Sequence, residues 1–394
     1  MVLILQLAAL ILMAAGNTMA RPVSPGPHQL AIGYTELQTD LAGGRHANVA
    51  TMRACTVRAD GSGRKELAPD IVGDSDTWTQ FAGWSPDGKT AVVGRGWESK
   101  ENAAWEEVNK NFRYNAEGWL YDTYLVNLSS SRRATNITAV DRVSYFNSGL
   151  FFWPGDANRL GFTALIDGNS HPYSMDISGH NKQDLTKASN EFTYGFSSAP
   201  DGKRIAYHKS YQIYLADADG SNALHIDTHN PFNFGPTWSP DGKWVLFLSG
   251  EHYKCHPTIV RADGTGLRKI ADRGIYSGAV DFLDVPDFHQ GSSDVPIWSP
   301  DGQWIYYAAQ KGNSVELFRA ATSGEAAPEQ LTTSATEGTT HYHPEATRDG
   351  KWLAYGCKRD GVRQLCVMRI SDHKETQITH FRRGRGAMWP HWRP

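Results

Sequence analysis

The residues best suited to chemistry in this sequence are histidines that fall in its irregular stretches. His341 and His343 flank Tyr342 and stand two residues apart in a segment that has the character of an extended strand. Side chains at i and i+2 of a strand project to the same side, which suits two ligands of one metal ion. Imidazole together with oxygen ligands suits Mn, Fe or Zn, so the pair predicts one divalent metal.

Other residues in the irregular stretches could complete such a site. We expect the metal ligands to be His252, His289, His341 and His343, and the ligand-binding residues to be His229, Gln290 and Arg142. The alternative is that each histidine is a hydrogen-bonded surface residue and that no metal is present. Both interpretations stay open on the sequence alone.

Arginines are the other candidates for chemistry. Arg382 and Arg385 belong to a basic run close to the C-terminal end of the sequence, and we expect them to act as catalytic groups or to bind a carboxylate. A guanidinium is almost always protonated, so acting as a base would need unusual surroundings. The alternative is a solvated basic loop.

A repeated turn organises the rest of the chain. In Trp238–Trp244, which reads WSPDGKW, Pro presets φ, Asp bonds to its own backbone and Gly takes the left-handed position. Short runs of β-branched and aromatic residues on either side of the turn are typical of strands. Related turns recur at 84–89, 198–203, 298–304 and 347–352, with degenerate copies at 152–158 and 388–393.

The spacing of these turns predicts an all-β fold, a seven-bladed β-propeller. The shorter gaps match the period of roughly 40–50 residues that a four-stranded blade needs. Three strand-like runs before the first turn lack an innermost strand, and the chain closes with one, so we expect the N-terminal strands to pair with the C-terminal strand. Longer gaps predict two insertions, at about 97–121 and at about 271–295. Trp97, Trp105, Val108 and Phe112 have roughly helical spacing, which predicts a short helix in the first insertion.

The repeats resemble those of the TolB-type β-propeller family, on the strength of the WSPDGK turns and an apolar start of the chain. The apolar run at the start of the chain, followed by Thr18-Met19-Ala20, predicts a signal peptide at 1–20 and export to the periplasm or outside the cell. The resemblance implies a propeller over residues 21–394. It implies a binding protein that takes a peptide, protein or oligosaccharide at the channel mouth, on the face that carries the histidines.

A second resemblance concerns the oligogalacturonate lyases, which are also seven-bladed propellers. The placement of the His341 and His343 pair and of His252 is similar to that of their manganese ligands, whereas Gly338 stands where a glutamine ligand is expected; Gln290 could substitute. This resemblance implies Mn as the metal and a metal-assisted β-elimination on uronic-acid-containing oligosaccharides. A purely structural docking role is a third possibility.

Bulk properties limit the remaining choices. The formal net charge is −3 over 394 residues, which gives no basic character for nucleic-acid binding. We expect a monomer whose mature chain has no transmembrane span. Cys357 and Cys366 flank a predicted hairpin, where either a disulfide or two unrelated buried thiols fits the sequence.

Overall fold

The computed structural model describes residues 29–113, 118–129, 134–139, 150–166, 169–187, 192–251, 254–288 and 291–394. The expected signal peptide at 1–20 therefore lies outside the described residues. The described part is all-β apart from helices α1 (Gly44–Val49) and α2 (Lys100–Asn109) and a 3-10 turn at Pro69–Ile71. None of the helices in these ranges is long and apolar enough to cross a membrane.

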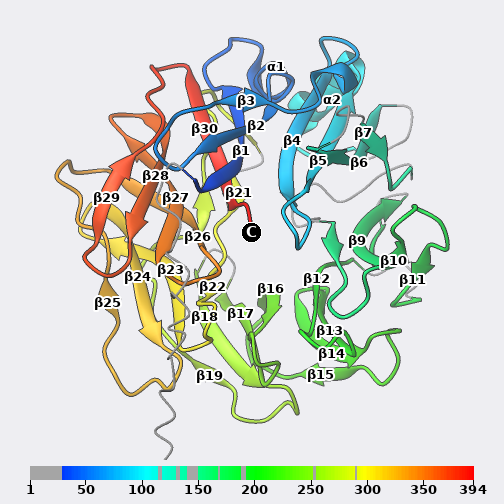
Figure 1. Ribbon diagram of the computed structural model, residues 1–394, viewed down its shortest axis with the longest axis vertical. Helices are drawn as coiled ribbons and strands as arrows, with labels where there is room; N and C mark the ends of the chain where they lie inside the picture. The colour runs from blue at the N-terminus through cyan, green and yellow to red at the C-terminus, as the bar shows by residue number, and fades with distance from the viewer. Residues whose placement is uncertain are drawn as a thin grey trace, which may run out of the picture.

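Five four-stranded antiparallel sheets lie around a central axis (Figure 1). The first combines β1 (Ala31–Gln38), β2 (Arg53–Arg58), β3 (Lys65–Glu66) and β30 (Arg385–Trp392); the second holds β4 (Thr77–Trp84), β5 (Thr90–Glu98), β6 (Trp119–Asn127) and β7 (Ala134–Asn136). The third holds β8 (Phe151–Phe152), β9 (Arg159–Ile166), β10 (Asn169–Asp176) and β11 (Gln183–Asp184). The fourth holds β12 (Thr193–Ser198), β13 (Arg204–Lys209), β14 (Gln212–Asp217) and β15 (Leu224–Ile226); the fifth holds β16 (Phe232–Trp238), β17 (Trp244–Glu251), β18 (Lys254–Arg261) and β19 (Arg268–Lys269).

The remaining strands form an eight-stranded sheet and a separate hairpin. The larger sheet holds β22 (Ile297–Trp298), β23 (Trp304–Lys311), β24 (Ser314–Ala321), β25 (Glu329–Gln330), β26 (Thr340–Ala346), β27 (Trp352–Arg359), β28 (Val362–Arg369) and β29 (Lys374–Gln377). Its two halves meet where Val315 of β24 pairs in parallel with Thr340 of β26. The hairpin consists of β20 (Ala279–Val280) and β21 (Ser292–Ser293).

The pairing of the two ends of the chain is as predicted. Strand β1 runs antiparallel to β30 from Ile32 opposite Trp392 to Gln38 opposite Arg385. The N-terminal and C-terminal segments therefore share one sheet, and the last strand lies near the centre of the ring (Figure 1). This pairing removes an exposed strand edge that would otherwise remain.

The repeated turns have the predicted geometry. In the turn after β16, Asp241 Oδ1 accepts a hydrogen bond from the Ser239 hydroxyl at 2.7 Å and another from the Lys243 main-chain N–H at 3.1 Å. Gly242 follows with φ of +69°, in the left-handed region that glycine adopts without strain. The Asp-Gly pair therefore fixes the turn, as its recurrence in the sequence suggests.

The tryptophans of the repeats join neighbouring sheets. The Nε1–H of Trp84 donates to the His391 carbonyl at 3.0 Å, and that of Trp392 donates to the Glu345 carbonyl at 2.9 Å. Trp298 makes the same kind of bond, at 3.2 Å, to Thr237. Each acceptor lies on the inner strand of a neighbouring sheet. The repeated Trp therefore links the inner strands of adjacent sheets by a hydrogen bond.

Both predicted insertions are present, the first with a helix that starts later than predicted and the second with a hairpin. The first contains α2, which begins after Ser99; the Ser99 hydroxyl accepts a hydrogen bond from the Asn102 main-chain N–H at 3.1 Å. Trp97 belongs to β5, so the helix starts later than the spacing of the aromatic residues predicted. The second carries the β20–β21 hairpin and buries Val280, Phe282 and Leu283 in a core cluster with residues of β1, β4, β9 and β26. This insertion therefore packs against sheets on several sides of the ring.

Candidate functional site

Asp294 organises the second insertion around the inner strand β26. Its side chain is 1% exposed, and it accepts hydrogen bonds from Arg273 Nη2 at 3.2 Å and from the Tyr276 hydroxyl at 3.1 Å. Its other oxygen accepts the main-chain N–H of His343 at 2.8 Å. Arg273 is equally buried and also donates to main-chain carbonyls. The charge pair is thus fully hydrogen-bonded, which a buried ion pair requires.

The His343 ring is oriented by the same insertion. Its Nε2 lies 3.1 Å from the carbonyl oxygen of Ser293 and 3.2 Å from the hydroxyl of Ser292. A carbonyl can only accept, so this contact places the ring proton on Nε2. Nδ1 then carries a lone pair; it is buried and has no hydrogen-bond partner in the described part of the chain. Burial lowers the pKa of His343, which keeps the imidazole neutral.

Tyr342, the preceding residue, presents a second polar atom of this kind. Its side chain is 1% exposed, and its hydroxyl makes no hydrogen bond within the described ranges. The Tyr342 and His343 rings meet edge-on with centroids 5.2 Å apart, and the Trp389 ring lies 6.3 Å from that of His343. Because an unpaired buried polar atom costs about 1–3 kcal/mol, two of them on consecutive residues favour bound polar groups.

Arg363 fixes the insertion from the opposite side. This β28 side chain, 1% exposed, donates to the Asp284 carboxylate at 2.7 Å and to the carbonyls of Asp281 and Leu283. Asp284 also accepts the Thr39 hydroxyl at 2.5 Å. The insertion is therefore tied to β28 and to the end of β1, so it spans part of the ring.

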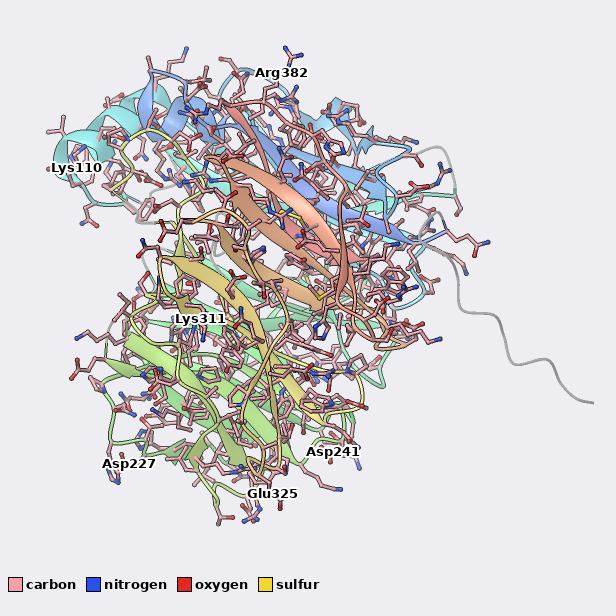
Figure 2. The ribbon with its side chains drawn as sticks, turned by 90° about the vertical axis from the view of Figure 1, so that its left-hand side faces the viewer. Lys110, Asp227, Asp241, Lys311, Glu325 and Arg382 are labelled. Atoms are coloured by element: carbon pink, nitrogen blue, oxygen red, sulfur yellow. A yellow bond between two sulfur atoms is a disulfide. The ribbon has the colours of Figure 1, made fainter. Side chains whose placement is uncertain are left out.

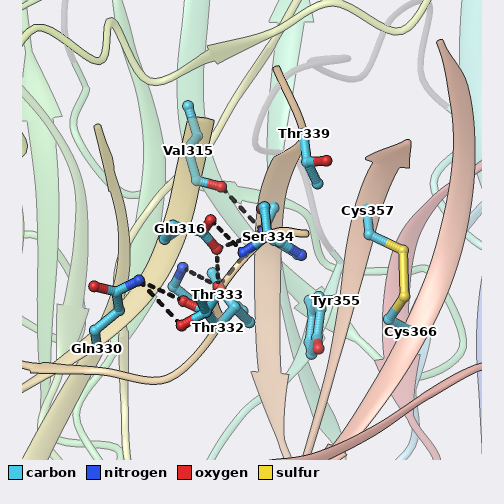
Figure 3. Close-up of polar contacts among 12 residues, drawn as sticks. Val315, Glu316, Gln330, Thr332, Thr333, Ser334, Thr339, Tyr355, Cys357 and Cys366 are labelled. Atoms are coloured by element: carbon cyan, nitrogen blue, oxygen red, sulfur yellow. Dashed lines mark hydrogen bonds and ion pairs between the residues drawn. A yellow bond between two sulfur atoms is a disulfide. The ribbon is translucent and has the colours of Figure 1, made fainter. Parts of the chain in front are cut away.

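His341 occupies a different environment from His343. Its Nδ1 lies 3.0 Å from the Val315 carbonyl and 3.1 Å from Glu316 Oε2, both on β24, and its Nε2 lies 3.4 Å from Arg359. Figure 3 shows the Glu316 carboxylate facing Thr332 and Ser334, which also donate to it. Burial raises the pKa of Glu316, but the hydrogen bonds from His341, Ser334 and Thr332 outweigh it and lower that pKa to about 2.

A β-bulge explains why the two histidines have different neighbours. The pairing of β26 with β27 shifts register between Tyr342 and Glu345, and His343 takes φ of +49°. The i and i+2 rule assumes an extended backbone, which a residue with positive φ does not have. The ring nitrogens of His341 thus contact β24 and Arg359, whereas Nε2 of His343 contacts Ser292 and Ser293 of β21.

The other described candidates lie apart from this site. His229 is exposed and pairs with its neighbour Asp227 at 3.2 Å, near the end of the molecule opposite Arg382 (Figure 2). Arg382 projects from the outer rim, and Arg385 pairs with the buried Glu36 at 3.1 Å. The remaining candidates fall outside the described residues: His252, His289, Gln290 and Arg142.

These positions bear directly on the expected metal. Among the residues that the structure describes, no group of three or more His, Cys, Asp or Glu side chains is arranged to hold a metal ion. Both ring nitrogens of His341 have protein partners, and of the His343 ring nitrogens Nδ1 has no partner among the described residues. The donors in the described part of the chain therefore do not fit a metal by themselves.

A second polar cluster anchors α2 to the end of β5. Asn102 donates to Glu98 Oε1 at 2.8 Å and to Glu106 Oε1 at 3.2 Å, and both carboxylates are almost fully buried. The Arg113 main-chain N–H also donates to Glu106, at 2.7 Å. Burial and the neighbouring Glu98 raise the pKa of Glu106 to about 7.

The residues that shape the site were not predicted from the sequence. Asp294 and Arg273 lie in the second insertion and Arg363 lies in a strand, and none of them was expected to have a role. A charged residue within an otherwise apolar strand, as Arg363 is in VRQLCV, is the signal that could have identified one of them. The partners of such a residue are set by tertiary packing.

Comparison with known proteins supports the fold and little beyond it. No family model matches the chain. It is 27% identical over 191 residues to an uncharacterized protein of Agrobacterium fabrum, a match covering 47% of this chain and 62% of that protein. The chain spans less than two thirds of the length of this and other curated relatives, which include TolB proteins and a dipeptidyl-peptidase.

Two solved structures extend the likeness across most of the chain. An oligogalacturonate lyase in complex with manganese superposes with a TM-score of 0.57 and 15% identity, covering 87% of this chain and 84% of that one. TolB from Acinetobacter baumannii gives a TM-score of 0.50 and 18% identity, covering 94% and 68%.

These likenesses and the four-stranded sheets define the class of the molecule as a β-propeller. The chain resembles TolB-type propellers in fold, as the turns had indicated. At these identities the likeness concerns architecture, and the role of the molecule has to be argued from its own residues.

Proposed function

We propose that this chain is an exported TolB-like β-propeller that binds a peptide or glycan at the end of the ring where the 271–295 insertion lies. The observation that carries the proposal is that two buried polar atoms, His343 Nδ1 and the Tyr342 hydroxyl, have no hydrogen-bond partner among the described residues. A ligand with a hydrogen-bond donor facing Nδ1 would satisfy the first. Binding sites are typically lined by aromatic side chains and a few polar groups of this kind.

Ring closure and blade number form part of the proposal. If the halves of the eight-stranded sheet count as separate blades, β22–β25 and β26–β29, they join the five four-stranded sheets in a seven-bladed ring. Residues 21–394 would then be one domain, which we expect to be monomeric. The shared sheet of β1 and β30 supports closure.

Export is supported by the cysteines. Cys357 on β27 and Cys366 on β28 form a disulfide, and both are fully buried. Disulfides persist in oxidising compartments and are rare in the cytosol. Together with the apolar start of the sequence, this favours a signal peptide at residues 1–20 and a periplasmic or secreted location.

The rival function is a metal-assisted lyase on uronic-acid-containing oligosaccharides. The likeness to the manganese-bound oligogalacturonate lyase and the open Nδ1 of His343 favour it. The engagement of His341 by Glu316 and Arg359 speaks against it, because a shared metal would have to displace those contacts. Binding therefore ranks first.

A two-part experiment separates these functions. Purified protein would be analysed for Mn, Fe and Zn and then incubated with polygalacturonate and oligogalacturonides while the absorbance of unsaturated uronate products is followed. We expect substoichiometric metal and no product, with binding detected in a screen of oligosaccharides and displayed peptides. Stoichiometric metal lost in His343→Ala, together with product formation, would establish the lyase instead.

A further inference from the structure

A cavity of about 510 Å³ lies against the fifth sheet, where the chain passes from β15 to β16. Cavities of this size are typical of sites for small molecules. We call it the fifth-sheet cavity. Its lining is largely polar and includes Asn230, Ser249, Glu251, Lys254, His256 and Lys269.

One wall of the cavity is a single face of the fifth sheet. Residues opposite each other in antiparallel strands share a face, and here Ser249 lies opposite His256 and Glu251 opposite Lys254. Phe247, on the same face, packs in a core cluster with residues of β13 and β14. The face is therefore directed toward the fourth sheet, and it changes from apolar to polar where the cavity lies.

His256 presents a hydrogen-bond donor to this cavity. The main-chain N–H of Arg273 donates to His256 Nδ1 at 3.1 Å. A main-chain N–H can only donate, so Nδ1 holds a lone pair and the ring proton lies on Nε2. Burial lowers the pKa of His256, which keeps the ring neutral. Within the described ranges, Nε2 makes no hydrogen bond.

The same position in the repeats that follow is used fully by the protein itself. Glu316 and Gln364 occupy it, in register with the tryptophan that follows each repeated turn. Glu316 accepts the Thr332 hydroxyl at 2.5 Å, and Gln364 accepts that of Thr379 at 2.8 Å. Each also accepts a main-chain N–H two residues further along. These side chains thereby fix the connection to the next inner strand.

The fifth sheet has only half of this arrangement. His256 accepts the main-chain N–H, but no hydroxyl reaches it, because Ala271 stands where the other repeats have threonine. The main-chain bond that precedes that threonine is made here by Ile270. The imidazole therefore has a polar atom that the connection does not use.

Lys254 supplies a positive charge at the cavity. It is exposed and forms no ion pair in the part of the chain that the structure describes. Lys269 is paired with Asp272 at 2.9 Å, and Arg268 bonds to carbonyls of the β24–β25 turn. One unpaired ammonium and one neutral N–H match a singly charged oxyanion. The exposed Glu251 carboxylate would repel a doubly charged one such as phosphate.

We propose that the fifth-sheet cavity is a second ligand site, which binds the carboxylate of a small organic acid between the Lys254 ammonium and the Nε2–H of His256. The Ser249 hydroxyl accepts the Asn230 amide at 3.0 Å and can donate its own hydrogen to the ligand. The inference goes beyond the proposed function, since none of the residues that line this cavity belongs to the site at His343.

The test uses Lys254→Gln and His256→Gln in the full-length mature protein. Glutamine at 256 matches Gln364, which accepts the same kind of main-chain N–H, so the connection should still form. Calorimetric titration would use acetate, succinate, glutarate and benzoate, with phosphate and sulfate for comparison. We expect wild type to bind at least one carboxylate, and each variant to lose tenfold or more in affinity. Lys254 is exposed, so its variant decides the outcome if His256→Gln fails to fold.

Lys243→Gln is the matched control, because Lys243 is an exposed lysine paired with Asp241 on a repeated turn. It should bind within twofold of wild type, as should His343→Ala. Wild-type protein that binds no carboxylate, or variants with unchanged affinity, would overturn the inference and leave the proposed function standing. Phosphate or sulfate bound as tightly as any carboxylate would overturn it too. A loss in His343→Ala as large as in Lys254→Gln would assign the acid to the other site and contradict the inference.

Discussion

The main-chain N–H of His343 donates a hydrogen bond of 2.8 Å to the buried carboxylate of Asp294. This bond ties the β-bulge of the inner strand β26 to the insertion that crosses from β20 to β21. It fixes the left-handed conformation that directs the His343 ring toward Ser292 and Ser293. The Asp294 carboxylate thereby links the bulge at His343 to the second insertion.

Asp294→Asn should destabilise the protein strongly. The variant leaves the buried Arg273 guanidinium without its charge partner, and breaking such a pair costs about 3–5 kcal/mol. Urea denaturation followed by Trp fluorescence would measure the loss. Asp372→Asn is the control, because Asp372 pairs with Arg369 on the surface and its change should leave the midpoint almost unmoved. Equal midpoints for wild type and Asp294→Asn would show that the pair is unimportant.

Glu106→Gln should stabilise the protein at alkaline pH. The folded pKa of about 7 lies above the ordinary value of 4.5, so stability from the protonated acid is full below pH 4.5 and declines as pH rises through 7. Glutamine keeps the acceptor for Asn102 and Arg113 without a charge. We expect a gain of about 1–2 kcal/mol at pH 8 and little change at pH 4.

Thermal unfolding of both proteins from pH 4 to pH 8 would test this. Glu101→Gln in the exposed first turn of α2 serves as control and should show no such pH dependence. A Glu106→Gln protein that is less stable than wild type at pH 8 would contradict the expectation that the buried Glu106 charge lowers the free energy of unfolding.

Glu316 should give the opposite pH dependence. Its folded pKa of about 2 lies below the ordinary 4.5, so its stabilisation is present above pH 4.5 and is lost as pH falls toward 2. Glu316→Gln should lower stability at pH 6 by up to about 3 kcal/mol and flatten the acid limb of the stability curve. Chemical denaturation between pH 6 and pH 2.5 measures this. Glu325→Gln, an exposed change, should keep the wild-type limb.

The Cys357–Cys366 disulfide should be present in exported protein. Thiol titration of denatured, non-reduced protein should then find two free thiols, from Cys55 and Cys255, and four after reduction. Replacing both bridge cysteines with serine should cost about 2–3 kcal/mol, as expected for a short closed loop. Four thiols without reduction would contradict both the bridge and the argument for export that depends on it.

Local turn chemistry made much of this fold predictable. The Asp241-Gly242 turn, the strands around it and the pairing of β1 with β30 follow from spacing and residue type, which are properties of short segments. The start of α2 was misplaced because Trp97 and Trp105 share helical spacing while Trp97 pairs with Leu120 in a sheet. Tertiary pairing here outweighs an apparent period.

The site was less predictable, and His343 shows why. Its neighbours Tyr342 and Pro344 suggest an extended strand, yet a bulge gives it positive φ and turns it away from the partners of His341. Arg385 looked free in sequence because Glu36, its partner, is 349 residues away. The pairing of β1 with β30 was predicted, but which side chains meet across these strands depends on their register, which the repeat spacing does not specify.

The most direct test of ligand binding at the insertion compares two histidine variants. His343→Ala removes the ring whose Nδ1 has no partner in the described ranges, whereas His229→Ala removes an exposed ring paired with Asp227. Calorimetric titration with the tightest oligosaccharide or peptide from the screen should show at least a tenfold loss for His343→Ala and wild-type affinity for His229→Ala. Wild-type affinity in both variants, with both correctly folded, would contradict a binding site at His343.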